Sequence, residues 1–109
     1  MVDISYKGLR RLNTLQIQYV KNLSEQEFKK IRRDFKDCTM FVDVKKQEKA
    51  GNRFKFSYHI RVESPNTILT AKQSDWDALK ALHKVFDNLK SEVTHKFKKE
   101  ATRRRTKKF

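Results

Sequence analysis

The 109-residue sequence is poor in residues that break regular structure, since it holds two glycines and one proline. Two glycines are too few for a glycine-rich loop that cradles phosphate groups. The single cysteine, Cys38, excludes an intramolecular disulfide and offers no thiolate set for a metal. The three histidines, His59, His83 and His95, are too widely spaced for a metal-binding motif. We therefore expect no metal and no other cofactor.

Long apolar runs and catalytic constellations are also missing. No stretch approaches the ~20 apolar residues of a membrane-spanning helix, and no signal-peptide pattern opens the chain. No paired carboxylates and no nucleophile–base set stand out, so nothing in the sequence indicates an enzyme. We expect a reduced, cytoplasmic setting, with neither a membrane nor a small-molecule substrate as partner.

Positive charge is what the chain has in excess. Lys and Arg number 27 against 13 Asp and Glu, which gives a formal net charge of +14. A field of this strength favours a polyanionic partner, most often nucleic acid and next an anionic membrane. The excess peaks in residues 96–109, KFKKEATRRRTKKF, with eight Lys/Arg and one Glu. Such a block tends to order only on an anion, although a basic surface can also serve solubility alone.

Residues 74–99, SDWDALKALHKVFDNLKSEVTHKFKK, have the clearest helical pattern. Apolar residues recur at three- and four-residue steps, as one buried helix face requires, while lysines fall on the opposite side. The apolar set is Leu79, Leu82, Phe86, Leu89 and Val93. Ser74 is a suitable N-cap, and Asp75 and Asp77 suit the positive end of the helix dipole. We predict one long helix that begins at Ser74.

Two interpretations of the N-terminal third compete. In one, residues 2–7 form the first strand and a helix runs over about 13–36. In the other, residues 15–21 form the first strand and the helix covers about 24–36, with residues 1–14 as an arm or an extra strand. The second has more local support, described next.

Ser24 and Glu27 have the S-x-x-E spacing of a capping box, in which each side chain satisfies a backbone N–H of the first turn. Leu23 and Phe28 stand where a hydrophobic staple would flank that cap. We therefore favour a helix that begins at Ser24.

From Thr39 the apolar period becomes two, which is typical of half-buried strands. This pattern predicts strands over 39–45, 53–62 and 67–72, joined by turns rich in Gly, Asn and Pro. One face of the middle strand is apolar. The other face carries Arg53, Lys55, His59 and Arg61. These four face either solvent or a ligand, and the pattern favours neither.

The element order is strand–helix–strand–strand–strand–helix. The economical packing lays both helices on one face of a four-stranded, mostly antiparallel sheet, in an α+β fold. We expect one domain over residues 15–99, followed by a basic tail over 100–109. Three aromatic residues are possible platforms for nucleic-acid bases: Tyr19, Tyr58 and Trp76. A place in the core is favoured for Tyr58, and packing over the end of the sheet for Trp76.

The run FKFSYHIRVESPNTILTAKQSDWDALKALHKVFDNLK, with the element order and the length of the chain, resembles the ribosome hibernation-promoting factors in their short form. This family is also called ribosome-associated inhibitor A or protein Y. The resemblance implies a β-α-β-β-β-α fold similar to a double-stranded-RNA-binding domain. It also implies a monomer off the ribosome that binds the small subunit and its rRNA in the channel for mRNA and tRNA. There it would inhibit translation under stress or in stationary phase.

In this family, basic residues on both helices contact the rRNA. On the first helix, the matching positions are Lys29, Lys30, Arg33 and Lys36. On the second helix, they are Lys80, Lys84, Lys90, His95 and Lys96. Five further residues are candidate rRNA contacts because of their charge alone: Lys98, Lys99, Arg103, Arg104 and Arg105. Asn88, Ser91 and Thr94 stand where relatives commonly carry Lys or Arg.

Two other functions compete with a ribosome-binding factor. A general double-stranded-RNA-binding module shares the fold, but such modules usually carry a basic motif at the start of the last helix, where this chain has Asp75 and Asp77. A basic protein-interaction module is the other alternative, and in that case the charge would aid solubility only.

Overall fold

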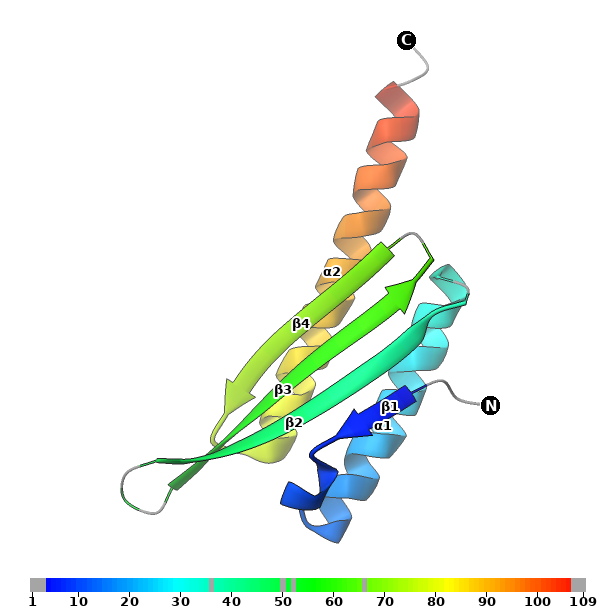
Figure 1. Cartoon of the computed structure of the whole chain (residues 1–109). Helices are drawn as coiled ribbons and strands as arrows, with labels where there is room; N and C mark the ends of the chain where they lie inside the picture. Colours follow the sequence, from blue (N-terminus) through cyan, green and yellow to red (C-terminus); the bar gives the residue numbers. More distant parts are fainter. Residues whose placement is uncertain (1–3, 36, 50, 52, 66, 107–109) are drawn as a thin grey trace.

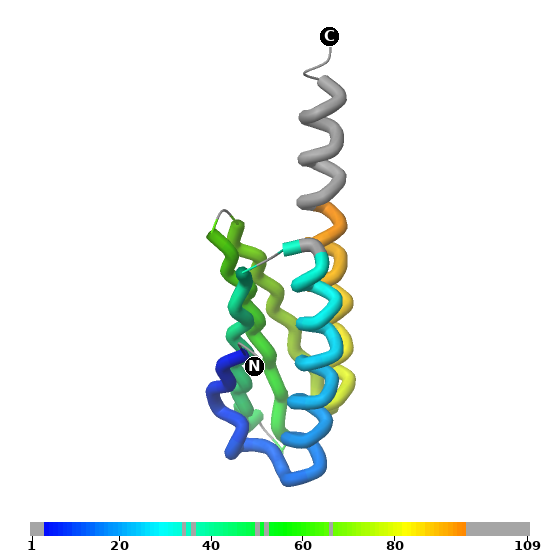
Figure 2. Tube along the Cα trace, turned by 90° about the vertical axis from the view of Figure 1, so that its right-hand side faces the viewer, coloured from blue at the N-terminus to red at the C-terminus, as the bar shows by residue number. Residues whose placement is uncertain are grey.

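The computed structural model describes residues 4–35, 37–49, 51, 53–65 and 67–106, with side chains except at residues 34 and 96–106. The elements are β1 (Ile4–Lys7), a 3-10 helix (Leu9–Arg11), α1 (Thr14–Asp34), β2 (Thr39–Lys49), β3 (Arg53–Ser64), β4 (Thr67–Asp75) and α2 (Ala78–Thr106). Over these residues, the chain forms two layers, a four-stranded sheet and two helices on one of its faces (Figures 1 and 2). The predicted α+β fold is confirmed.

The strands lie side by side in the order β1-β2-β3-β4. β1 is parallel to β2, with Ile4 opposite Met40, whereas β2–β3 and β3–β4 are antiparallel. Successive side chains of a strand point to opposite faces, so one side chain in two reaches the helices. The buried set of the two central strands is Met40, Val42, Val44, Tyr58, Ile60 and Val62. Tyr58 therefore lies in the core, as predicted.

α1 begins ten residues before the predicted Ser24, so the favoured strand over 15–21 and the favoured helix start are both wrong. Asn13 caps the helix through a reciprocal capping box with Gln16. The Gln16 N–H donates to Asn13 Oδ1 at 2.7 Å, and the Asn13 N–H donates to Gln16 Oε1 at 3.1 Å. Asn and Gln satisfy the free N–H groups of a first helical turn as Ser and Glu do.

The buried stripe of α1 explains why the longer helix forms. Val20, Ser24, Glu27 and Ile31 recur at three- and four-residue steps, and each is at most 5% exposed. Two of these four positions are polar, so the helical period is hidden when apolar residues alone are counted. Leu15, which would face the core of the favoured strand, is 80% exposed. Lys36, the predicted helix end, lies outside the described residues.

The predicted start of the last helix is also wrong. Ser74 and Asp75 are the final residues of β4, and α2 begins at Ala78. The helix then runs to Thr106, through residues that we assigned to a tail. Its buried face carries Leu82, Phe86 and Leu89 as predicted.

α1 and α2 lie side by side and run in the same direction (Figure 1). Two contacts between the helices follow this alignment, Tyr19 with His83 near the start and Glu27 with Lys90 further along. None of the described helices is long and apolar enough to cross a lipid bilayer.

Gly8 joins β1 to the 3-10 helix in a left-handed conformation, with φ of 84°. A Cβ atom at this position would lie 2.2 Å from the carbonyl oxygen of Val44. Such a distance is far inside van der Waals contact, and L-residues adopt this φ only with strain. Glycine is therefore required at this turn, where the chain leaves β1 and passes close to β2.

Candidate nucleic-acid interface

The predicted rRNA contacts fall in the helical layer. On α1, the side chains of Lys29, Lys30 and Arg33 are exposed. On α2, those of Lys80, Lys84, Lys90 and His95 are exposed. The backbone of Lys96, Lys98, Lys99, Arg103, Arg104 and Arg105 belongs to α2, and their side chains lie outside the described part.

Parallel helices bring two of these lysines to one groove. Glu27, on the inner side of α1, is 5% exposed. Its Oε1 lies 3.6 Å from Lys30 Nζ on its own helix and 3.2 Å from Lys90 Nζ on α2. A cavity of about 360 Å³ opens here, lined by Glu27, Lys30, Ile31, Lys90, Val93 and Thr94. Two ammonium groups therefore share one carboxylate at the mouth of an interhelical groove.

The apolar floor of the groove keeps Glu27 from water, so this carboxylate needs the lysines as partners. The lysines are about half exposed, and each ammonium has positions left for a further anion. The sequence assigned Glu27 to a cap and gave no signal of its contact with Lys90. That contact depends on the alignment of α1 with α2.

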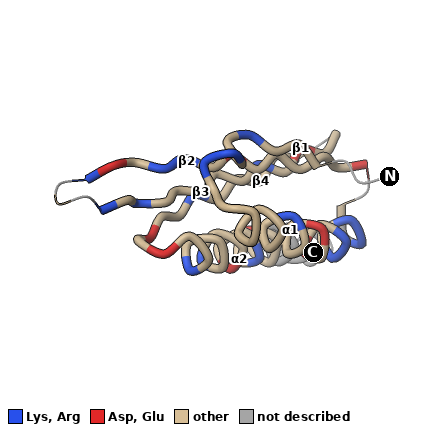
Figure 3. Tube along the Cα trace, turned by 90° about the horizontal axis from the view of Figure 1, so that it is seen from below, with Lys and Arg blue, Asp and Glu red and all other residues tan. Residues whose placement is uncertain are grey.

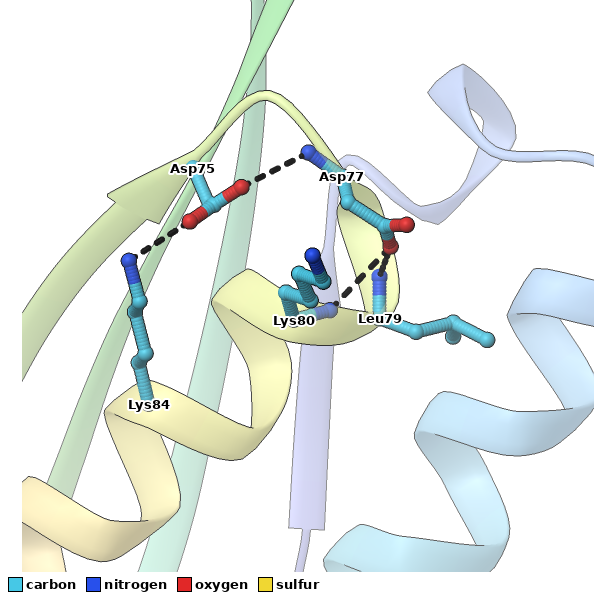
Figure 4. A network of polar contacts seen from close by, with 5 residues as sticks. All are labelled: Asp75, Asp77, Leu79, Lys80 and Lys84. Atoms are coloured by element: carbon cyan, nitrogen blue, oxygen red, sulfur yellow. Dashed lines mark hydrogen bonds and ion pairs between the residues drawn. The ribbon is translucent and has the colours of Figure 1, made fainter.

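Lys84 is less available than its position suggests. Its Nζ lies 2.5 Å from Asp75 Oδ2, at the end of β4 (Figure 4). The hydrogen bond from Lys84 lowers the pKa of Asp75 to about 2, so the carboxylate is ionised at neutral pH. A phosphate would have to displace this partner to reach Lys84. Lys84 is therefore the weakest candidate of the described set.

Asp77 caps α2, a role that the sequence assigned to Ser74. Its Oδ1 accepts the N–H groups of Leu79 at 2.9 Å and Lys80 at 3.2 Å (Figure 4). Asp75 in turn accepts the Asp77 N–H at 3.0 Å. Two carboxylates therefore occupy the start of α2, where an anion would otherwise find free N–H groups.

Tyr19 and His83 join the helices near the acidic start of α2. The Tyr19 hydroxyl lies 2.8 Å from His83 Nε2, and the two rings meet edge to face at 5.7 Å between centroids. Tyr19 is thereby held by a neighbour, and its ring is directed at α2. This contact makes Tyr19 a structural link between the helices.

The basic residues of α1 are gathered at its C-terminal half. Residues 29–33 hold four Lys/Arg and no carboxylate, whereas residues 14–28 hold Lys21 against Glu25 and Glu27. Lys90 and His95 lie along the neighbouring part of α2, followed by the basic run from residue 96. In Figure 3, Lys and Arg are seen on the helices and on the strands of the sheet. One end of the helical layer is thus strongly cationic, and the other is nearly balanced.

Among the described residues, no group of three or more His, Cys, Asp or Glu side chains converges in a way that could hold a metal ion. What this surface offers is two ammonium groups at one groove, with further exposed Lys and Arg along α1. Such groups bind phosphate oxygens by charge and by hydrogen bonds.

Comparisons with known proteins support the fold. No family model matches the chain. No curated protein matches it by sequence either. Among solved structures, the chain is similar to the crystal structure of the N-terminal domain of Protein Y from Thermus thermophilus, with a TM-score of 0.54 and 20% sequence identity. The match covers 86% of this chain and 96% of the Thermus domain, so the two share one fold over most of their length.

Proposed function

We propose that this chain is a non-enzymatic ribosome-binding factor that recognises rRNA of the small subunit with the cationic end of its helical layer. The observation that carries the proposal is the groove where Lys30 and Lys90 converge from two parallel helices. The fold shared with a Protein Y domain supports the same function. Binding in the channel for mRNA and tRNA would then inhibit translation, as the family resemblance implies.

Cosedimentation with purified small subunits at near-physiological salt tests the proposal. We expect the chain in the small-subunit fraction, and its release as salt rises. Each phosphate contact adds roughly 0.7–0.9 to the slope of log affinity against log salt. If the chain stays out of that fraction and binds free RNA equally well, the ribosome-binding proposal is wrong.

Charge-removing variants test the surface. The double variant Lys30→Gln/Lys90→Gln should weaken binding to the small subunit. It should also lower the slope of log affinity against log salt by the contribution of about two phosphate contacts. Lys84→Gln removes one lysine charge from α2, the helix that carries Lys90, but the ammonium of Lys84 is already paired with Asp75. We therefore expect a much smaller effect from Lys84→Gln. If Lys84→Gln loses half as much binding free energy as the double variant, as one removed charge against two predicts, net charge decides binding and the groove does not.

An in vitro translation assay tests the inhibitory step. Adding the chain to a reconstituted system should lower protein synthesis, and Lys30→Gln/Lys90→Gln should restore it in proportion to lost binding. Binding without inhibition would leave a ribosome-associated protein that does not occupy the channel.

A general double-stranded-RNA-binding module is disfavoured by Asp75 and Asp77 at the start of α2. A competition experiment separates the two functions. Excess duplex RNA should displace a general duplex binder from small subunits, and it should leave a factor specific for the subunit in place.

A further inference from the structure

The face of the sheet that points away from the helices, called the open face here, carries a second basic surface. Trp76 follows β4 at the edge of this face and keeps 44% of its surface exposed. Two cations lie over its ring, Arg53 with Cζ at 4.3 Å and Lys55 with Nζ at 5.7 Å from the centroid. The predicted packing of Trp76 is thus partial, and its described neighbours are charged.

The end of the β2–β3 hairpin adds a like-charge pair. Lys49 lies directly opposite Arg53 in the register of the two strands. Like charges in such a position repel each other unless an anion lies between them. In the part of the chain that the structure describes, neither these two nor Lys55 forms an ion pair with a carboxylate. We call Lys49, Arg53, Lys55 and Trp76 the Trp76 cluster.

The same face continues from the Trp76 cluster along β3, because alternate residues of a strand share one side. His59 and Arg61 line a hollow of about 510 Å³ with Lys7, Phe41 and Asp43. Arg61 lies over Phe41, with Cζ at 4.7 Å from the ring centroid, and also pairs with Glu63 at 3.1 Å. The open face thus offers two aromatic rings, each accompanied by arginine.

We propose that the Trp76 cluster binds single-stranded RNA. A base stacks on the exposed part of the indole ring, and the flanking phosphates contact Lys49, Arg53 and Lys55. Neighbouring nucleotides follow β3 toward the hollow beside Phe41. Aromatic rings set among Lys and Arg are how proteins hold unpaired nucleotides without sequence preference. Duplex RNA is excluded, because its bases are stacked on one another and expose no face to the indole.

This surface is independent of the proposed rRNA-binding groove. The groove lies in the helical layer, whereas the Trp76 cluster lies on the opposite side of the sheet and on the β2–β3 hairpin. Figure 3 shows that hairpin reaching past the helices, with Lys and Arg on both of its strands. Either surface can therefore fail its test while the other passes.

Trp76 is the single tryptophan of the chain, so its fluorescence reports on this cluster alone. Titration with an oligouridylate of ~12 nucleotides should quench the emission as bases stack on the indole. Heparin is the control, because it carries comparable negative charge and has no bases. Equal quenching by heparin and by the oligonucleotide would overturn the stacking step.

Affinity measured with a dye-labelled oligouridylate tests the residues. Trp76→Ala should weaken binding about tenfold, and Trp76→Phe, which keeps an aromatic ring, should recover most of the loss. Arg53→Gln/Lys55→Gln should also weaken binding of the oligouridylate, and it should lower the slope of log affinity against log salt. The matched control is Arg11→Gln/Lys21→Gln. Arg11 on the 3-10 helix and Lys21 on α1 are exposed, and both lie outside the two proposed surfaces.

Thermal unfolding monitored by circular dichroism checks that each variant is folded. Since Trp76 and Arg53 are exposed, we expect unfolding close to that of the native chain. The proposal is wrong if Trp76→Ala binds as tightly as the native chain. It is also wrong if the Arg53/Lys55 and Arg11/Lys21 double variants lose the same affinity, since binding would then depend on net charge alone.

Discussion

The carboxylate of Glu27 on α1 lies 3.2 Å from the ammonium of Lys90 on α2, across the groove between the helices. Because Lys30 shares that carboxylate, one buried acid holds two cations at the cationic end of the helical layer. This arrangement sets the local charge near +1, and it ties the position of both lysines to a single residue.

Glu27→Gln should raise affinity for small subunits or rRNA fragments, because both lysines then lack a competing carboxylate. The free energy of unfolding should fall by about 1 kcal/mol, since both lysines are half exposed and lose only a screened partner. Urea unfolding and a binding titration measure the two effects. Glu25→Gln, an exposed site on the same helix, is the control for net charge. If both variants gain the same affinity, the groove has no special part in binding.

Asp75 should make stability depend on pH in strong acid. Its pKa is lowered to about 2 from 3.8, mainly by the hydrogen bond from Lys84. Between these values the unfolded chain binds more protons than the folded chain, so stability rises with pH. The contribution is complete above the ordinary pKa and is lost as pH falls through about 2. The stability difference between the native chain and Asp75→Asn should therefore shrink from pH 5 to pH 2 in urea unfolding. A constant difference over this range would contradict the assignment.

Tyr58→Phe should stabilise the protein by about 1 kcal/mol. The Tyr58 hydroxyl is fully buried and has no hydrogen-bond partner among the described groups, and burial raises its pKa to about 12. The phenylalanine ring fills the same space without that polar atom. Tyr19→Phe is the matched control, because it removes a hydroxyl that is bonded to His83. Urea unfolding should show opposite signs for the two variants, and a loss of stability in Tyr58→Phe would reveal a partner for its hydroxyl.

Gly8→Ala should cost about 3 kcal/mol of stability, because it adds a Cβ clash with Val44 to the strain of a left-handed backbone. Gly51→Ala isolates the strain alone. Gly51 has a similar φ of 80°, and a Cβ there would meet nothing within 4 Å. The second variant should cost about 1–2 kcal/mol. Thermal or urea unfolding compares them, and equal costs would mean that the Gly8 loop moves away from β2.

Strands β2, β3 and β4 could be predicted because their period of two coincides with burial. Met40, Val42 and Val44 are apolar and buried, and their neighbours in sequence face away. α1 could not be predicted by the same reasoning, because its buried face includes Ser24 and Glu27. Those two residues also match a capping box, which predicts a helix start at Ser24. Packing of the buried stripe instead favours a helix that already includes Ser24, and packing determined the fold.

The candidate site was predictable only in part. Charge and family resemblance indicated the basic residues of both helices, but not which of them meet. The convergence of Lys30 and Lys90 on Glu27 and the ion pair of Lys84 with Asp75 depend on how separate elements align in space. The sequence indicated Trp76 as a possible platform for bases but favoured its packing over the end of the sheet, because a large aromatic residue in a single sequence is expected to be buried.

The parallel pairing of β1 with β2 bears on the order in which the chain folds. β2, β3, β4 and α2 follow one another as neighbours in sequence and space, whereas the connection between Ile4 and its partner Met40 contains the whole of α1. Closing that long loop costs entropy before β1 gains any contact. The four-residue edge strand should therefore join last and open first. Native-state hydrogen exchange would then find the amides of Ile4–Lys7 exchanging faster than those at the centre of β3.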